Sequence, residues 1–267
     1  MNLKNIKIVV LLPSLSFWLS FQLLNWQATW LWWTLLALFL INLVNINFLP
    51  GISRPLWPKI LLAAAPSLFS LGLLIYVSLL ASSFYLQVLV FLGALIIYQY
   101  WRLAYRKLSP KPIKQKILQV FSNKGEDLAF IGVSLYVIFL AIFLLASSFF
   151  AIKYFLSLSY LLMFSLLAIS VFVLTISAAD LSGLFIKKEQ RYYWFILSFI
   201  IWQFGVSLFF LPLNYSVLGF VLALAFYLAF NLSRFALSNN LSKNRLRWYI
   251  GFPLLATAIL LFSAKWL

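Results

Sequence analysis

Five polar side chains lie inside or at the ends of long apolar runs, where polar groups are costly and often functional. They are Asn42, Asn45, Gln99, Asp180 and Asn231. Asn42 and Asn45 are three residues apart and so share one face of a helix. All five fall toward the cytoplasmic ends of the spans assigned below. We predict that they line a cavity in the inner half of the membrane. The alternative is that they form hydrogen bonds between helices.

Three prolines support the cavity interpretation. Pro13, Pro66 and Pro253 fall about one to two turns in from that same side. A proline inside a helix leaves the carbonyl of residue i−4 without its usual donor and kinks the helix. Kinks and amides gathered in the inner half would suit a cavity that opens to the cytoplasm.

The chain lacks the residue types that most enzymes use for catalysis. There is no Cys and no His, which excludes thiol nucleophiles, zinc sites and histidine-ligated heme and removes the commonest general base. The four acidic residues, Glu126, Asp127, Asp180 and Glu189, all fall at or beyond span ends. No carboxylate is therefore available in mid-membrane to couple transport to protons or sodium. No cofactor is expected.

A serine–lysine pair is the remaining formal nucleophile. It would combine Ser147 or Ser148 with Lys153 at the outer surface. Serine is abundant here and a lysine in a loop is ordinary, so the pair carries little weight.

The elements that must position these residues are membrane-spanning helices. Of the 267 residues, 65% are hydrophobic and only 9% are charged, whereas a soluble domain has about 25% charged residues. We predict an all-α, polytopic transmembrane helical bundle, with residues 1–267 forming a single integral membrane domain. A bilayer core needs about 20 apolar residues in helix. Nine segments meet that demand: 6–24, 28–49, 60–80, 84–101, 129–150, 154–174, 194–211, 215–232 and 249–266.

The basic residues predict the orientation. With nine spans, 18 of the 20 Lys and Arg fall on one side, which identifies it as cytoplasmic. They are Lys4, Lys7, Arg54, Lys59, Arg102, Arg106, Lys107, Lys111, Lys114, Lys116, Lys124, Lys187, Lys188, Arg191, Arg234, Lys243, Arg245 and Arg247. We expect a plasma-membrane protein with its N-terminus inside and its C-terminus outside. If the last segment, which ends near Lys265, only dips into the bilayer, there are eight spans.

The longest cytoplasmic loop, residues 102–128, is also the most basic. Within it, residues 112–121 have apolar side chains at helical spacing. We predict a short amphipathic helix on the inner leaflet, with Lys107, Lys111, Lys114 and Lys116 contacting anionic lipid head groups. The alternative is a solvated linker. The basic clusters account for the net charge of +16 without any nucleic acid as partner.

A six-residue motif recurs 65 residues apart. Leu79–Phe84 and Leu144–Phe149 both have the sequence Leu-Leu-Ala-Ser-Ser-Phe. A third segment, Phe209–Asn214, follows after the same interval but shares only the position and not the sequence. We expect all three at outer turns between paired spans. They are consistent with a repeated helical hairpin of about 65 residues, or with the fixed thickness of the bilayer alone.

Two functional classes are favoured equally by the sequence. One is a carrier or binder of a lipid or small amphiphile without ion coupling. The other is a membrane scaffold or accessory subunit that binds other membrane proteins. A membrane enzyme is less favoured.

The charge pattern generates a test of topology. Because the chain has no Cys, single cysteines report their own location. Ser82→Cys and Asn214→Cys should react with an impermeant thiol reagent in intact cells, whereas Ser122→Cys and Asn240→Cys should react only after permeabilisation. Reversed labelling at two of these sites would contradict the nine-span topology.

Overall fold

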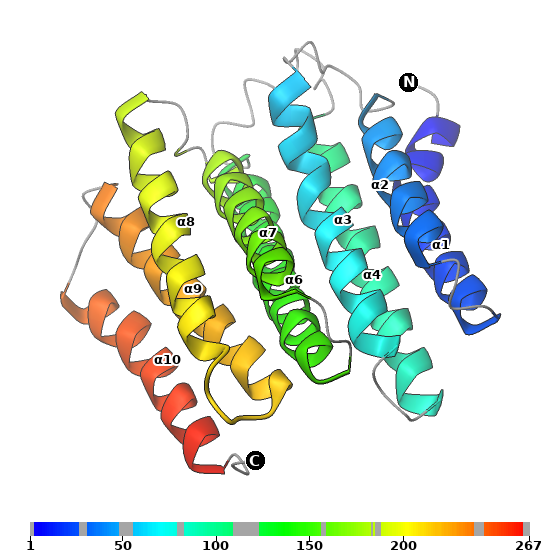
Figure 1. Cartoon of the computed structure of the whole chain (residues 1–267). Helices are drawn as coiled ribbons and strands as arrows, with labels where there is room; N and C mark the ends of the chain where they lie inside the picture. Colours follow the sequence, from blue (N-terminus) through cyan, green and yellow to red (C-terminus); the bar gives the residue numbers. More distant parts are fainter. Residues whose placement is uncertain are drawn as a thin grey trace. The chain divides into compact units, whose positions relative to one another are not determined.

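A computed structural model describes residues 3–26, 31–47, 56–78, 83–108, 123–155, 159–182, 184, 188–237 and 243–263. Nine α-helices occupy these residues (Figure 1). They are α1 (Leu3–Trp26), α2 (Leu31–Asn47), α3 (Leu56–Ser78), α4 (Ser83–Leu108), α6 (Asn123–Phe155), α7 (Tyr160–Leu181), α8 (Lys188–Leu208), α9 (Tyr215–Leu237) and α10 (Lys243–Ser263). The chain divides within α6 into two compact units, residues 1–138 and 139–267.

Five described stretches are long and apolar enough to cross a membrane. They are Lys59–Ser78, Tyr85–Tyr105, Phe130–Ile152, Tyr160–Leu181 and Tyr215–Leu237. Shorter apolar stretches, Val10–Gln22 and Leu36–Ile46, lie in α1 and α2. The predicted helical bundle is confirmed, and its apolar helices indicate insertion into a membrane. The number of spans stays a prediction.

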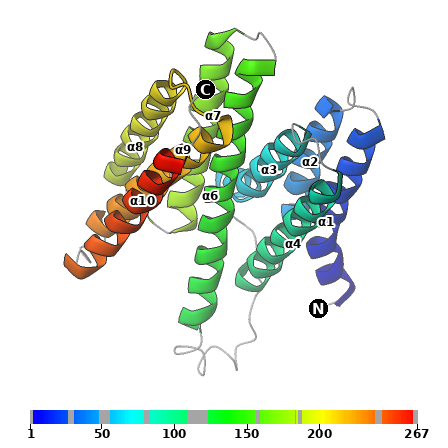
Figure 2. The same ribbon diagram turned by 90° about the horizontal axis from the view of Figure 1, so that it is seen from below.

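In the first unit, α1 packs against α2 and α4, and α3 packs against α2 and α4 (Figure 2). A glycine allows close packing at the centre of these helices. A Cβ atom at Gly93 of α4 would lie 3.3 Å from a ring carbon of Phe17 on α1 and would collide with Leu73 on α3. Phe17 and Leu73 are themselves buried. The three helices thus meet at a point where one side chain has to be absent.

Pro66 lies inside α3 and is buried. Because proline has no N–H, the carbonyl of Leu62, four residues earlier, loses its helical donor. The hydroxyl of Tyr100 on α4 donates to this Leu62 oxygen at 2.7 Å. Tyr100 is completely buried, so the interaction both satisfies a buried acceptor and ties α4 to the proline position of α3.

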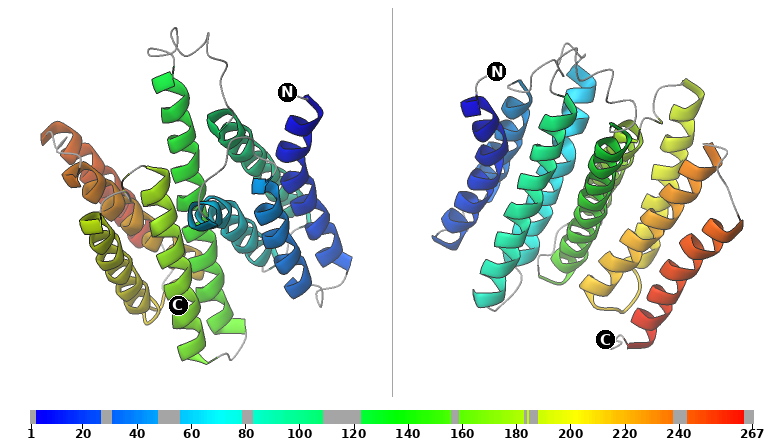
Figure 3. Two further views of the ribbon diagram at one scale, coloured as in Figure 1. Left: turned by 90° about the horizontal axis from the view of Figure 1, so that it is seen from above. Right: turned by 180° about the vertical axis from the view of Figure 1, so that it is seen from behind.

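In the second unit, α8 packs against α7 and α9, and α10 packs against α9 (Figure 3). The C-terminal half of α6 approaches α9 closely at Gly219, where a Cβ atom would meet the Ser147 hydroxyl and lie 2.9 Å from the Phe143 carbonyl oxygen. Phe220 packs edge-on against both Phe139 and Phe143. Glycine and aromatic side chains together join these two helices.

The turn after α6 differs from the sequence prediction. We expected the chain to leave the fifth span at residues 151–153, but α6 continues to Phe155. The motif copy Leu144–Phe149 therefore lies inside a helix, where Ser147 and Ser148 are buried, and not at a turn. Nothing in its apolar and small residues ends a helix. Phe209–Asn214 does connect α8 to α9, while residues 79–82 of the first copy lie outside the described residues.

The contact between Tyr100 and Leu62 can be tested by a double-mutant cycle. Tyr100→Phe should lower the free energy of unfolding by about 1 kcal/mol, since it leaves a buried carbonyl without a donor. In a Pro66→Ala background the helix supplies its own N–H to Leu62, so the same change should cost much less. Tyr98→Phe, at a half-buried neighbour on α4, is the control. Equal losses in both backgrounds, measured by thermal unfolding in detergent, would contradict this role for Tyr100.

Candidate functional site

The five predicted cavity residues lie in different surroundings. In the first unit, Asn42 and Asn45 are buried on α2, whereas Gln99 on α4 is exposed. In the second unit, Asn231 is buried on α9 and Asp180 is half-buried at the end of α7. Asn42 and Asn45 thus share a buried face, but Gln99 does not join them there. That all five line one cavity stays a prediction.

Asn42 takes part in a contact between helices. Its carboxamide oxygen accepts a hydrogen bond from the indole N–H of Trp101 on α4 at 3.1 Å, and its NH₂ donates to the Leu38 carbonyl at 2.9 Å. Trp101 is completely buried, and its ring packs edge-on against Tyr100. These bonds support the alternative interpretation, in which the amide joins α2 to α4.

Among the described residues of its unit, the side chain of Asn231 bonds only within its own helix. Its NH₂ donates to the Tyr227 carbonyl of α9 itself at 2.8 Å. Asn42 and Asn231 therefore make the same bond within their own helices, and Asn42 accepts a further one from a neighbouring helix.

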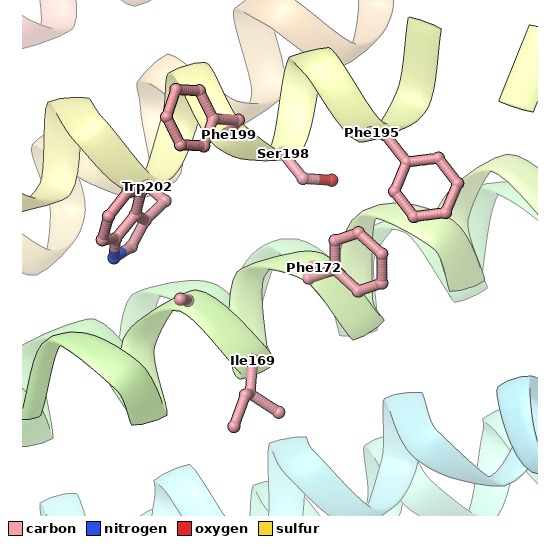
Figure 4. A pocket seen from close by; sticks show the side chains of 7 residues that line it. Ile169, Phe172, Phe195, Ser198, Phe199 and Trp202 are labelled. Atoms are coloured by element: carbon pink, nitrogen blue, oxygen red, sulfur yellow. The ribbon is translucent and has the colours of Figure 1, made fainter. Parts of the chain in front are cut away.

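A groove that the sequence did not predict lies between α7 and α8 in the second unit (Figure 4). Its volume is about 400 Å³, within the range of small-molecule sites. It is lined by Ala168, Ile169, Phe172, Phe195, Ser198, Phe199 and Trp202. Ile169, Phe195 and Phe199 are exposed, so the groove opens at the protein surface.

The polar atoms along this groove already have partners. The Ser198 hydroxyl donates to the Trp194 carbonyl at 2.7 Å, and the Trp202 N–H donates to the Phe164 carbonyl at 3.0 Å. Two ring pairs form most of its lining: Phe172 and Phe195, with centroids 4.8 Å apart, and Phe199 and Trp202, 5.4 Å apart. The groove therefore presents an aromatic, apolar surface on which neither of these two side chains has a spare hydrogen-bond donor.

Sequence reasoning missed the groove for a clear reason. Tryptophans near the ends of apolar runs, such as Trp101 and Trp194, are typical of a membrane interface, and Trp202 lies in the middle of its run with no pattern that indicates a groove. The structure shows Trp101 and Trp194 completely buried, with Trp194 donating to the Leu184 carbonyl at 3.2 Å. A buried indole N–H generally needs a partner, but the sequence does not indicate which carbonyl supplies it.

The other candidate sites are placed only in part. Ser147 and Ser148 are completely buried, and Ser148 donates to the Leu144 carbonyl at 2.7 Å, so neither presents a nucleophile at the surface. The side chain of Lys153 lies outside the described residues, as do those of Lys107, Lys111, Lys114 and Lys116 and the predicted amphipathic helix at 112–121. Among the described residues, no three acidic side chains gather as metal ligands would.

The fold and these sites define a helical protein whose apolar helices insert into a membrane. Compared with known proteins, the chain matches no protein-family model, no curated protein and no solved structure. Its function must therefore be argued from its own residues.

The contact between Asn42 and Trp101 predicts a measurable coupling. Asn42→Leu should destabilise the protein by about 1 to 2 kcal/mol, and in a Trp101→Phe background by less, because hydrogen bonds between membrane helices contribute about 0.6 to 1.7 kcal/mol. Asn231→Leu is the matched control, since it removes the same kind of bond within one helix only. Unfolding of each purified variant in detergent measures the coupling. Additive losses for Asn42→Leu and Trp101→Phe would show that the bond contributes nothing.

Proposed function

We propose that the protein is a multi-pass protein of the plasma membrane with nine spans, its N-terminus in the cytoplasm and its C-terminus outside. The basic clusters between the apolar runs support this orientation. The helices α1, α2, α8 and α10 supply the four spans beyond the five long apolar stretches. For α8, which ends at Leu208, the apolar run continues into the turn residues Phe209, Phe210 and Leu211, so the apolar segment extends beyond the helix itself.

We further propose that it binds a lipid or small amphiphile, without ion coupling, by holding the apolar part of the molecule in the α7–α8 groove. The observation that carries this proposal is the aromatic lining of the groove, in which Ser198 and Trp202 already have backbone acceptors. A ligand group that accepts hydrogen bonds would find no free donor on these side chains. An acyl chain or a flat apolar ring needs none.

The proposed topology gives the ligand an orientation. The chain enters α8 from the cytoplasmic side, so Phe195 and Ser198 belong to the inner half of the bilayer and Trp202 to its centre. Arg191 lies one helical turn before Phe195, is exposed, and belongs to the basic cluster that precedes the groove. An amphiphile with its apolar part in the groove would therefore present its polar end at the inner surface.

Selectivity would come from shape and packing. Lipid tails are as apolar as the groove, so moving a chain from bilayer to groove gains no hydrophobic free energy. The remaining contribution to binding free energy is van der Waals contact with rings such as those of Phe172 and Phe199. A groove of this kind favours rigid or unsaturated apolar groups over flexible saturated chains, because they lose less conformational freedom when they bind.

A second function, as a scaffold or accessory subunit, is favoured by a different observation. The carboxamide oxygen of the buried Asn42 accepts a hydrogen bond from Trp101 and so joins α2 to α4. Its role is therefore structural. A scaffold needs such internal joints and an exposed face for its partners, and needs no ligand.

Photo-crosslinking can decide whether the groove binds an amphiphile. Purified full-length protein in liposomes would be irradiated with a trace of phospholipid that carries a diazirine in its acyl chain, and the labelled peptides mapped by mass spectrometry. Ala168→Phe adds a ring inside the groove and should lower labelling of α7 and α8 several-fold. The matched control is Leu166→Phe, at an exposed position of α7 that is not part of the groove lining; its labelling should equal the wild type.

Two outcomes would contradict the amphiphile-binding proposal. One is uniform labelling of all exposed helices, in proportion to their contact with lipid. The other is an equal loss of labelling in Ala168→Phe and Leu166→Phe, since that would reflect a general disturbance of α7.

A further inference from the structure

The face of α8 turned away from its neighbours carries a regular stripe. Tyr193, Ile196, Ile200, Gln203 and Ser207 follow one another at intervals of three and four residues, so they share one side of the helix. All five are exposed, and the three apolar ones are each more than half exposed. A different side of α8 is buried; its members include Trp194, Leu197, Ile201 and Leu208. That buried side accounts for the packing of α8 on α7 and α9.

Gln203 is a polar side chain on a face that is otherwise mostly apolar. It lies in the middle of the predicted span 194–211, and its side chain makes no hydrogen bond with any residue that the structure describes. Hydrocarbon offers no donor or acceptor, so an exposed carboxamide at this depth carries a free-energy cost. A partner that supplies both a donor and an acceptor would remove the cost.

We propose that this stripe is the interface of a homodimer, in which Gln203 of each copy hydrogen-bonds to Gln203 of the other. A carboxamide has an NH₂ donor and a carbonyl acceptor. A two-fold axis brings identical residues face to face, so two reciprocal bonds satisfy both amides. A second copy of this chain is therefore sufficient by itself, whereas a lipid chain satisfies neither group.

The rest of the stripe fits the same partner. Apolar residues at alternating intervals of three and four are the pattern by which two helices interlock, and one polar residue within that pattern sets register and oligomeric state. Ile196 and Ile200 would pack about the axis on one side of Gln203, and Ser207 is small enough for close approach on the other. The proposal needs α8 to cross the bilayer, but it does not depend on the groove.

Disulfide cross-linking in membranes tests the interface with a matched pair of variants. Ile196→Cys lies on the stripe and Phe195→Cys lies one residue away, at nearly the same depth but on the groove side of α8; both positions are exposed (57% and 43%). In liposomes containing only this full-length chain, Ile196→Cys and Ile200→Cys should form disulfide-linked dimers and Phe195→Cys should form few. Adding Gln203→Leu to Ile200→Cys should raise the dissociation constant in lipid about tenfold, the loss expected for two bonds of this kind.

Three outcomes would overturn the homodimer. Equal cross-linking of Ile196→Cys and Phe195→Cys would indicate random collision, and an undiminished yield when Gln203→Leu is added to Ile200→Cys would remove the amide from the interface. Cross-linking of Ile200→Cys to a different protein in native membranes, with none between copies in liposomes, would assign the stripe to that partner. Unfolding of Gln203→Leu in detergent is the control for fold, and should match the wild type because the side chain is exposed.

Discussion

Polar groups buried among these helices must find hydrogen-bond partners inside the protein, because neither an apolar core nor lipid supplies one. The arrangement of the first unit follows from this constraint. Pro66 removes a donor from α3, and Tyr100 restores it to Leu62 from α4. The next residue, Trp101, donates to Asn42 on α2. Two adjacent residues of α4 thus reach two different helices, and each bond fixes the rotation of α4 about its own axis.

Serine side chains satisfy the same constraint without joining helices. Ser67, Ser70, Ser148 and Ser198 each donate to the carbonyl four residues earlier in their own helix. A hydroxyl that is bonded in this way behaves as a small, nearly apolar side chain toward its neighbours. Helices also approach closely at a serine that makes no such bond: α6 meets Gly219 of α9 at Ser147, whose buried hydroxyl has no partner among the described residues. Glycine and serine therefore set the spacing of helices, while Tyr100, Trp101 and Asn42 set which helices are joined.

The sequence was sufficient to predict the helical class because that prediction depends on composition and run length, which are local. Helix ends were less certain: α6 runs on to Phe155 because its small and apolar residues contain no stop signal. The partners of polar residues could not be predicted, since Asn42 and Trp101 are separated by 58 intervening residues and several carbonyls are available to any indole. The groove could not be predicted from the sequence either. It depends on how α7 and α8 are rotated against each other, which no residue pattern in either helix specifies alone.

The distribution of polar groups also bears on function. In the first unit, the Asn42 amide and the Trp101 indole are occupied by structural bonds, and the groove in the second unit is lined mostly by rings. Chemistry that requires a free buried acid, base or nucleophile has no support in these positions. Among the residues described in the second unit, two exposed features bear on binding: an aromatic groove that suits an apolar ligand, and a face of α8 on which Gln203 requires a polar partner. The two lie on different sides of one helix, because Trp202 and Gln203 are neighbours in sequence and so point about 100° apart. A single span can therefore bind an amphiphile on one side and a second protein on another, so that the carrier and scaffold interpretations are compatible in one molecule.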